Sequence, residues 1–146
     1  MASDLHQRQE NLMHFFHQAP ICKTYGMRML YDESGSAIFE LRYNPNFNHT
    51  FGGIHGGVIA TLLDNAGWFT VAPHSENWIA TVEFTTRLLE AVKEVDLRSR
   101  GTLVRLGKKL SVANMEVRTF DDRLIAIGSG TFANTSVPLQ TNGDLK

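Results

Sequence analysis

The stretch HGGVIATLLDNAGWFTV, residues 55–71, decides the fold of this chain. It predicts one long helix from Gly56 to about Val71, stopped by Pro73. When each residue turns the chain by about 100°, one side of this helix is an apolar arc. The arc consists of Val58, Ile59, Leu62, Leu63, Ala66 and Phe69. Such an arc is typical of a helix packed on a core, so we expect this segment to be the central helix.

Strand patterns flank this helix on both sides. Before it, two extended runs joined by turn residues at 32–35 predict a hairpin, and residues 44–53 predict a loop. After it, residues alternate in three segments, 78–84, 95–99 and 113–117, and the segment 124–133 closes the series of strands. Gly107 and Asp121-Asp122 lie at the joins, as hairpin turns would. The expected fold is α+β, with an antiparallel sheet of about six strands wrapped around one long helix.

A second helix is expected at the N-terminus, over about residues 3–18. Its apolar residues have helical spacing and predict that it packs on the main body; they are Leu5, Leu12, Phe15 and Phe16. Pro20 marks the expected end of this helix. The tail after about residue 137 is polar and is expected to fray.

Size and composition point to one domain over residues 1–146, of an ordinary soluble type. A net charge of −1 argues against broad electrostatic binding to nucleic acid or to an anionic membrane. The single cysteine, Cys22, cannot form an intramolecular disulfide. The start of the chain is unlike a signal peptide, and no apolar run approaches 18 residues. We therefore expect a cytoplasmic protein.

Two glycines at the start of an apolar helix need a reason, because glycine is a poor helix former. The N–H groups of Gly56 and Gly57 can bind an oxyanion or polarise a carbonyl; the alternative is a tight turn without a ligand. Asp64 lies about two turns further, off the apolar arc and beside the small residues Ala60 and Gly67. It could act as a general base or nucleophile, or it could be a solvated helix aspartate.

The pattern His55-Gly56-Gly57, then six residues, then Asp64, resembles the signature of the PaaI-like thioesterases. These are hotdog-fold acyl-CoA hydrolases related to enzymes of phenylacetate degradation. The resemblance extends over about residues 44–133, and residues 104–109 resemble the family's late strand–turn–strand, where a basic residue follows a glycine. It implies a hotdog fold and hydrolysis of acyl-CoA to free acid and CoA, without a cofactor.

The resemblance also implies roles for individual residues. The backbone N–H of Gly56 would polarise the thioester carbonyl, and Asp64 from the other subunit of a homodimer would activate water or attack. His49, six places before the motif histidine and adjacent to Asn48, would help to hold the carbonyl or the water. Thr81 would support the nucleophile. Family members usually form dimers of dimers, so the resemblance implies a homotetramer.

Other residues are candidates for substrate contact. Arg105, Lys108 and Lys109 could contact the phosphates of CoA, although a solvated hairpin turn explains them equally well. Trp68 lies off the apolar arc near Asp64 and could line an acyl pocket. His55 is more readily interpreted as a residue that hydrogen-bonds neighbouring backbone and fixes the turn.

Two other function classes compete with a thioesterase. A hotdog dehydratase would need a histidine paired with a carboxylate on the helix, a pattern that this sequence lacks. A non-catalytic acyl-CoA-binding module would be expected to lose the aspartate, and this chain keeps Asp64. The six histidines have no spacing typical of a metal-ligand set, so we expect no metal site.

Overall fold

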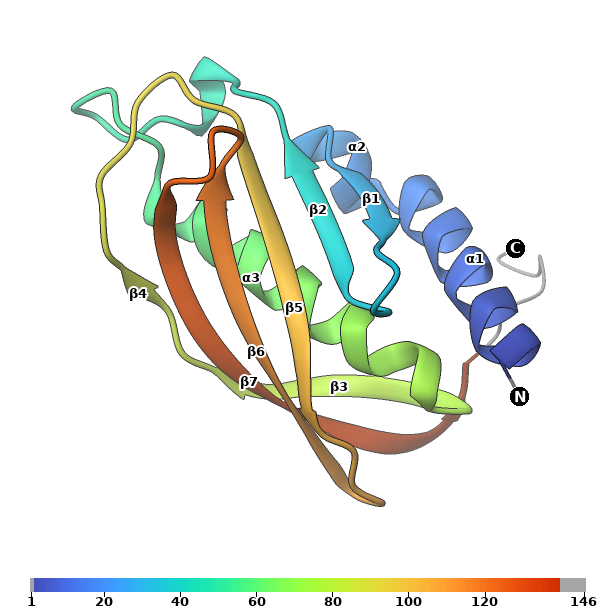
Figure 1. Ribbon diagram of the computed structural model, residues 1–146. Helices are drawn as coiled ribbons and strands as arrows, with labels where there is room; N and C mark the ends of the chain where they lie inside the picture. Colours follow the sequence, from blue (N-terminus) through green and yellow to red (C-terminus); the bar gives the residue numbers. More distant parts are fainter. Residues whose placement is uncertain (1, 140–146) are drawn as a thin grey trace.

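The computed structural model describes residues 2–139 and contains a seven-stranded antiparallel sheet (Figure 1). Its elements in chain order are α1 (Ala2–Gln18), α2 (Pro20–Tyr25), β1 (Arg28–Tyr31), β2 (Ala37–Leu41), η1 (Pro45–Phe47), α3 (Gly56–Val71), η2 (Ala72–His74), β3 (Asn77–Phe84), β4 (Arg87–Leu88), β5 (Leu97–Arg105), β6 (Leu110–Thr119) and β7 (Leu124–Pro138). The strand order is β1-β2-β5-β6-β7-β3, and the short β4 also pairs with β7. The predicted α+β hotdog architecture is confirmed, with β4 as an additional strand.

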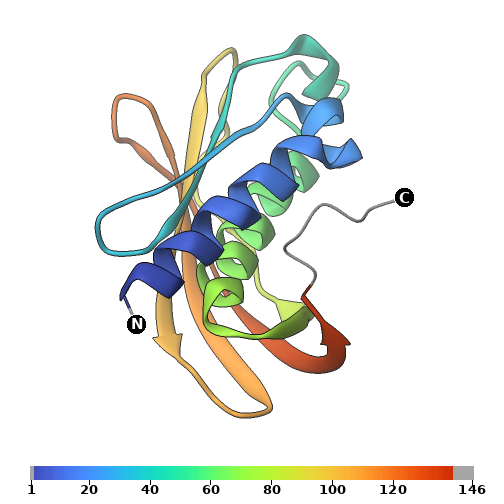
Figure 2. The ribbon, with the colours of Figure 1, turned by 90° about the vertical axis from the view of Figure 1, so that its right-hand side faces the viewer.

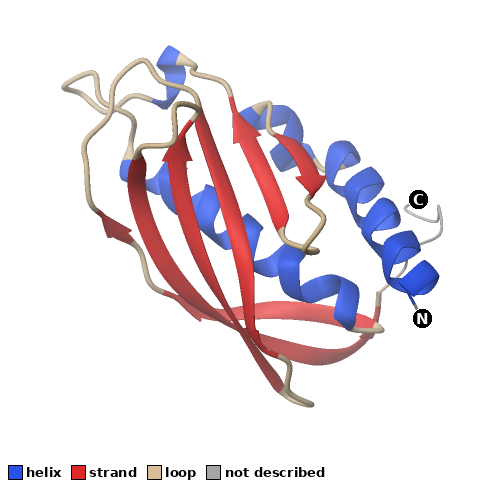
Figure 3. Cartoon of the chain, in the orientation of Figure 1, coloured by secondary structure: helices blue, strands red, loops and turns tan. Residues whose placement is uncertain are grey.

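The sheet curves around α3, as the long strands β5, β6 and β7 show in Figure 3. Most of the predicted apolar arc of α3 is buried, and only Phe69 stays partly exposed. The backbone of β5 comes close to the helix at Gly101, where an added Cβ would lie 2.2 Å from the carbonyl oxygen of Ala66. Only a residue without a side chain allows this approach, which holds α3 tightly against the sheet.

The N-terminal helix is present and begins at Ala2, close to the predicted start. Its residues Leu12 and Phe16 are buried, and the Phe16 ring contacts Phe39 of β2 with centroids 4.9 Å apart. Figure 2 shows α1 crossing in front of α3. The helix ends at Gln18, two residues before Pro20, as predicted. Pro20 itself begins a separate short helix, α2, because proline suits the first turn of a helix.

The remaining elements follow the predicted order. The hairpin of β1 and β2 pairs Tyr31 with Ala37 around the predicted turn. The loop at residues 44–53 contains the short helix η1. Strand β7 continues to Pro138, and residues 140–146 of the expected polar tail lie outside the described residues. Between residues 2 and 139, none of the helices has the length and apolar character needed to cross a membrane.

Candidate active site

The first turn of α3 is organised by His55, which is its N-cap residue with φ −63° and ψ 133°. The Gly57 N–H donates to Nδ1 of His55 over 2.9 Å, which is the backbone hydrogen bond expected for this histidine. The Val58 N–H donates to the His55 carbonyl. Within residues 2–139 the Gly56 N–H has no hydrogen-bond partner. The helix therefore begins with one N–H, that of Gly56, available to a carbonyl or oxyanion.

Asp64 lies half-buried in the middle of α3 and faces β3. The hydroxyl of Thr81 donates a hydrogen bond of 2.9 Å to its carboxylate. Burial raises the pKa of Asp64, and the hydrogen bond from Thr81 lowers it; burial is the larger effect, so the pKa is raised. A carboxylate with a raised pKa is a stronger base than an ordinary aspartate. The structure thus brings together two of the residues predicted from the sequence.

Gly56 and Asp64 are separated along the helix axis. They are eight residues apart in α3, which corresponds to about 12 Å at 1.5 Å per residue. A carbonyl within hydrogen-bond reach of the Gly56 N–H is therefore out of reach of Asp64 on the same helix. A single chain does not assemble both groups around one reacting carbonyl.

His49 and Asn48 lie in the loop before α3 and make mainly local contacts. Nδ1 of His49 accepts a hydrogen bond from the Phe51 N–H at 3.1 Å, and the His49 N–H donates to the Gly53 carbonyl. The amide nitrogen of Asn48 donates to the Tyr43 hydroxyl at 2.9 Å. The other amide atom, Oδ1 of Asn48, is buried without a partner among the described residues. The contact of His49 with a carbonyl or water stays a prediction.

Trp68 connects α3 to β3 beside the pair of Asp64 and Thr81. Its Nε1–H donates to the Ile79 carbonyl over 2.9 Å, and its ring lies 4.8 Å from that of Trp78 between centroids. This contact, which the sequence does not reveal, holds the strand in place two residues from Thr81. The role of Trp68 in an acyl pocket stays a prediction.

The three predicted phosphate contacts, Arg105, Lys108 and Lys109, are exposed around the β5–β6 hairpin. The backbone of this hairpin is ordered by Asn134, whose amide nitrogen donates to the Lys108 carbonyl at 2.9 Å. In Figure 1 the hairpin lies at the end of the sheet remote from the start of α3. The structure does not bring these cations to the Gly56 amide of the same chain.

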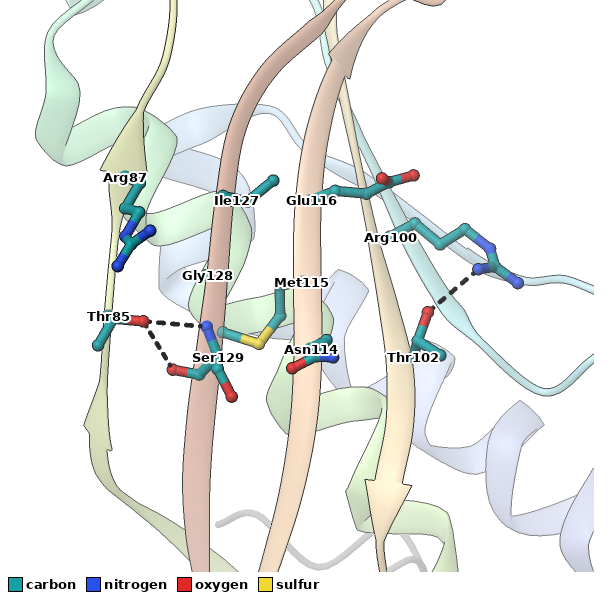
Figure 4. A pocket seen from close by; sticks show the side chains of 10 residues that line it. All are labelled: Thr85, Arg87, Arg100, Thr102, Asn114, Met115, Glu116, Ile127, Gly128 and Ser129. Atoms are coloured by element: carbon teal, nitrogen blue, oxygen red, sulfur yellow. Dashed lines mark hydrogen bonds between the residues drawn. The ribbon is translucent and has the colours of Figure 1, made fainter.

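A cavity of about 490 Å³ lies on the outer face of the sheet and not at α3. Figure 4 shows Arg87 and Arg100 on opposite sides of this groove, with Asn114 and Ser129 between them. Arg100 is already paired with Asp32 at 2.9 Å. None of the site residues predicted from the sequence lines the groove. This groove is therefore separate from the predicted site residues.

Comparison with known proteins shows the family of the chain. The family model of the thioesterase superfamily matches residues 51–126, just over half of the chain, and this range contains Gly56, Asp64 and Thr81. A candidate esterase of Saccharolobus solfataricus is 27% identical over 120 residues, which cover 80% of this chain and 86% of that protein. Together the family and this relative indicate hydrolysis of thioesters or esters.

Solved structures share the fold at low sequence identity. The PaaI protein of the E. coli phenylacetic acid degradation operon has a TM-score of 0.85 at 15% identity, covering 94% of this chain and 99% of that one. A thioesterase family protein of Silicibacter pomeroyi has a TM-score of 0.80 at 24% identity, with 86% and 96% covered. The chain belongs to the thioesterase superfamily and has the hotdog fold.

Proposed function

We propose that this protein hydrolyses acyl-CoA thioesters to a free acid and CoA. The observation that carries the proposal is the environment of Asp64, a half-buried carboxylate with a raised pKa that Thr81 holds in place. The Gly56 N–H, at the start of the same helix, supplies a donor for a carbonyl oxygen. A base and an oriented donor are the two groups that thioester hydrolysis by water requires.

The reaction proceeds by addition of water to the thioester carbonyl. Asp64 removes a proton from water as the water oxygen bonds to the carbonyl carbon, and negative charge develops on the carbonyl oxygen. The Gly56 N–H stabilises that charge, by about 2.7–4 kcal/mol if it matches a single oxyanion-hole donor in other enzymes. The carbon–sulfur bond then breaks, and the CoA sulfur leaves as a thiolate that takes up the proton. Direct attack by Asp64 would instead form an anhydride that water hydrolyses.

The functional unit in this proposal is a homodimer. The separation of about 12 Å between Gly56 and Asp64 along one helix means that each site takes one group from each copy. The strand β3 ends the sheet order and is open along one edge, which suits pairing with a second chain. Trp78 and Val82 of this strand are exposed apolar residues that such a partner would cover. Two dimers would then form the expected homotetramer.

The proposal is tested with the purified protein and a panel of acyl-CoAs of different chain length and aromatic character. Release of free CoA thiol from at least one member, lost in the Asp64→Asn variant, is the expected result. Binding of acyl-CoA without turnover would identify a binding module instead. Hydrolysis confined to oxygen esters would also contradict the proposal.

A further inference from the structure

Leu88 of β4 lies directly against Gly56. A Cβ added to Gly56 would be 2.7 Å from Cδ1 of Leu88 and 3.9 Å from its Cγ. Apart from the two neighbouring residues and the backbone of the helix, no other atom lies within 4 Å. The leucine side chain therefore fills the space in which residue 56 would carry a side chain. Leu88 is nevertheless 52% exposed, so much of its apolar surface stays open beside the Gly56 amide.

The position of Leu88 is fixed by its surroundings. Strand β4 pairs with β7, and the next residue, Leu89, donates its N–H to the Ile125 carbonyl at 2.8 Å. The Val92 carbonyl accepts a hydrogen bond of 2.9 Å from the Ile54 N–H, which ties this segment to the loop before α3. Figure 4 shows Arg87 on the groove side of β4, and neighbouring strand residues point to opposite sides. Leu88 is thus held on the side that faces α3.

We propose that Leu88 is a specificity-determining residue that forms the apolar wall of the acyl site beside the Gly56 amide. The inference rests on the proposed function, in which that amide binds the thioester carbonyl. The carbon atom next to the carbonyl then comes within reach of a side chain that contacts Gly56. Leu88 limits the bulk of the acyl group at that carbon. It also keeps water from the amide, which strengthens the hydrogen bond to the carbonyl.

Two acyl-CoA isomers distinguish this role from general exposure of apolar surface. One has the straight chain that the wild-type protein hydrolyses fastest, and the other has the same number of carbons with a methyl branch next to the carbonyl. The ratio of kcat/KM for the branched over the straight isomer is measured in Leu88→Ala, Leu88→Phe and Leu89→Ala. Leu89 is the matched control, because it is also 52% exposed and has no atom within 4 Å of a Cβ placed on Gly56.

The expected result is a rise of about tenfold in this ratio for Leu88→Ala, the size typical of one methylene group in an apolar pocket. Leu88→Phe should lower the ratio, and Leu89→Ala should leave it within about twofold. An unchanged ratio in both Leu88 variants, or an equal change in Leu89→Ala, overturns the role of Leu88 while thiol release still supports the proposed function. Absence of thiol release from every acyl-CoA in the wild-type protein overturns the proposed function, and the role of Leu88 with it.

Discussion

The hydroxyl of Thr81 donates a hydrogen bond of 2.9 Å to the carboxylate of Asp64, and so joins β3 to the middle of α3. The same bond opposes the effect of burial on the pKa of Asp64. Trp68 reinforces the junction through its bond to the Ile79 carbonyl. Both the orientation and the base strength of the carboxylate therefore depend on how β3 sits against α3.

Replacing Thr81 by valine should raise the pKa of Asp64 further, because the bond that stabilises its charged form is lost. The acidic limb of the pH profile of kcat/KM should move to higher pH, since the carboxylate must be ionised to act as a base. Thr81→Ser keeps the hydroxyl, so its acidic limb should lie at the same pH as that of the wild-type protein. The measurement is the rate of thiol release as a function of pH. An acidic limb at the same pH in Thr81→Val as in the wild-type protein would contradict this role of Thr81.

Asp64→Asn should stabilise the folded protein near neutral pH. A carboxyl group whose pKa is raised by folding contributes stability below its unfolded pKa, and this contribution is lost as pH rises through the folded pKa. The neutral amide of the asparagine side chain avoids that loss. The excess in unfolding free energy of Asp64→Asn over the wild-type protein should therefore shrink as the pH falls. Urea denaturation of both proteins across the acidic range tests this, and a difference that grows on acidification would be the contrary outcome.

Loss of the helix cap at His55 should destabilise the fold. His55→Ala leaves the Gly57 N–H without its acceptor, at a cost of about 1 kcal/mol, as for other N-cap residues. Asparagine is a strong N-cap residue, so His55→Asn should recover most of this loss. Unfolding free energies from urea titration provide the comparison. Equal destabilisation by alanine and asparagine would argue against capping as the role of His55.

Gly56→Pro should remove the proposed carbonyl donor without breaking α3. Proline suits the first position of a helix, and the ψ of 133° at His55 suits a residue that precedes proline. We expect kcat to fall by about 10²–10³-fold, as for loss of one oxyanion-hole donor. Gly56→Ala is the control, because it introduces the same Cβ against Leu88 and keeps the N–H. A proline variant as active as the alanine variant would exclude the Gly56 amide from catalysis.

Mixing two inactive variants tests whether each site is shared between chains. After dissociation and reassociation, a heterodimer of Asp64→Asn and Gly56→Pro contains one site with both native groups. Random pairing should then restore roughly a quarter of wild-type turnover, since about half of the dimers are mixed and each has one intact site. A mixture no more active than its components would place each site within a single chain.

The sequence predicts the central helix closely because its boundaries carry strong local signals. The glycine pair opens α3, Pro73 follows its end, and the apolar arc spans every turn between them. Among the elements that the sequence did not predict, α2 and β4 lack such signals. The short helix α2 starts at Pro20, which is equally compatible with the end of a helix, and β4 has only two residues and no alternation of its own.

The candidate site is harder to predict from the sequence, because its contacts join segments that are far apart along the chain. Asp64 and Thr81 are 17 residues apart on different elements, and the resemblance, not periodicity, linked them. The residue that a Cβ at position 56 would meet is Leu88, which is 32 residues further along the chain. No local pattern around β4 marks Leu88 as a neighbour of the helix start.

The most direct test of the account is the rate at which the Asp64→Asn variant releases free thiol from the preferred acyl-CoA. The substitution keeps the size of the side chain and an oxygen that can accept the hydrogen bond from Thr81, so folding and assembly should be preserved. Turnover should fall by about 10²-fold or more, because the base that activates water is gone. Near-normal turnover in a folded Asp64→Asn protein would contradict the assignment of Asp64 and, with it, the proposed mechanism.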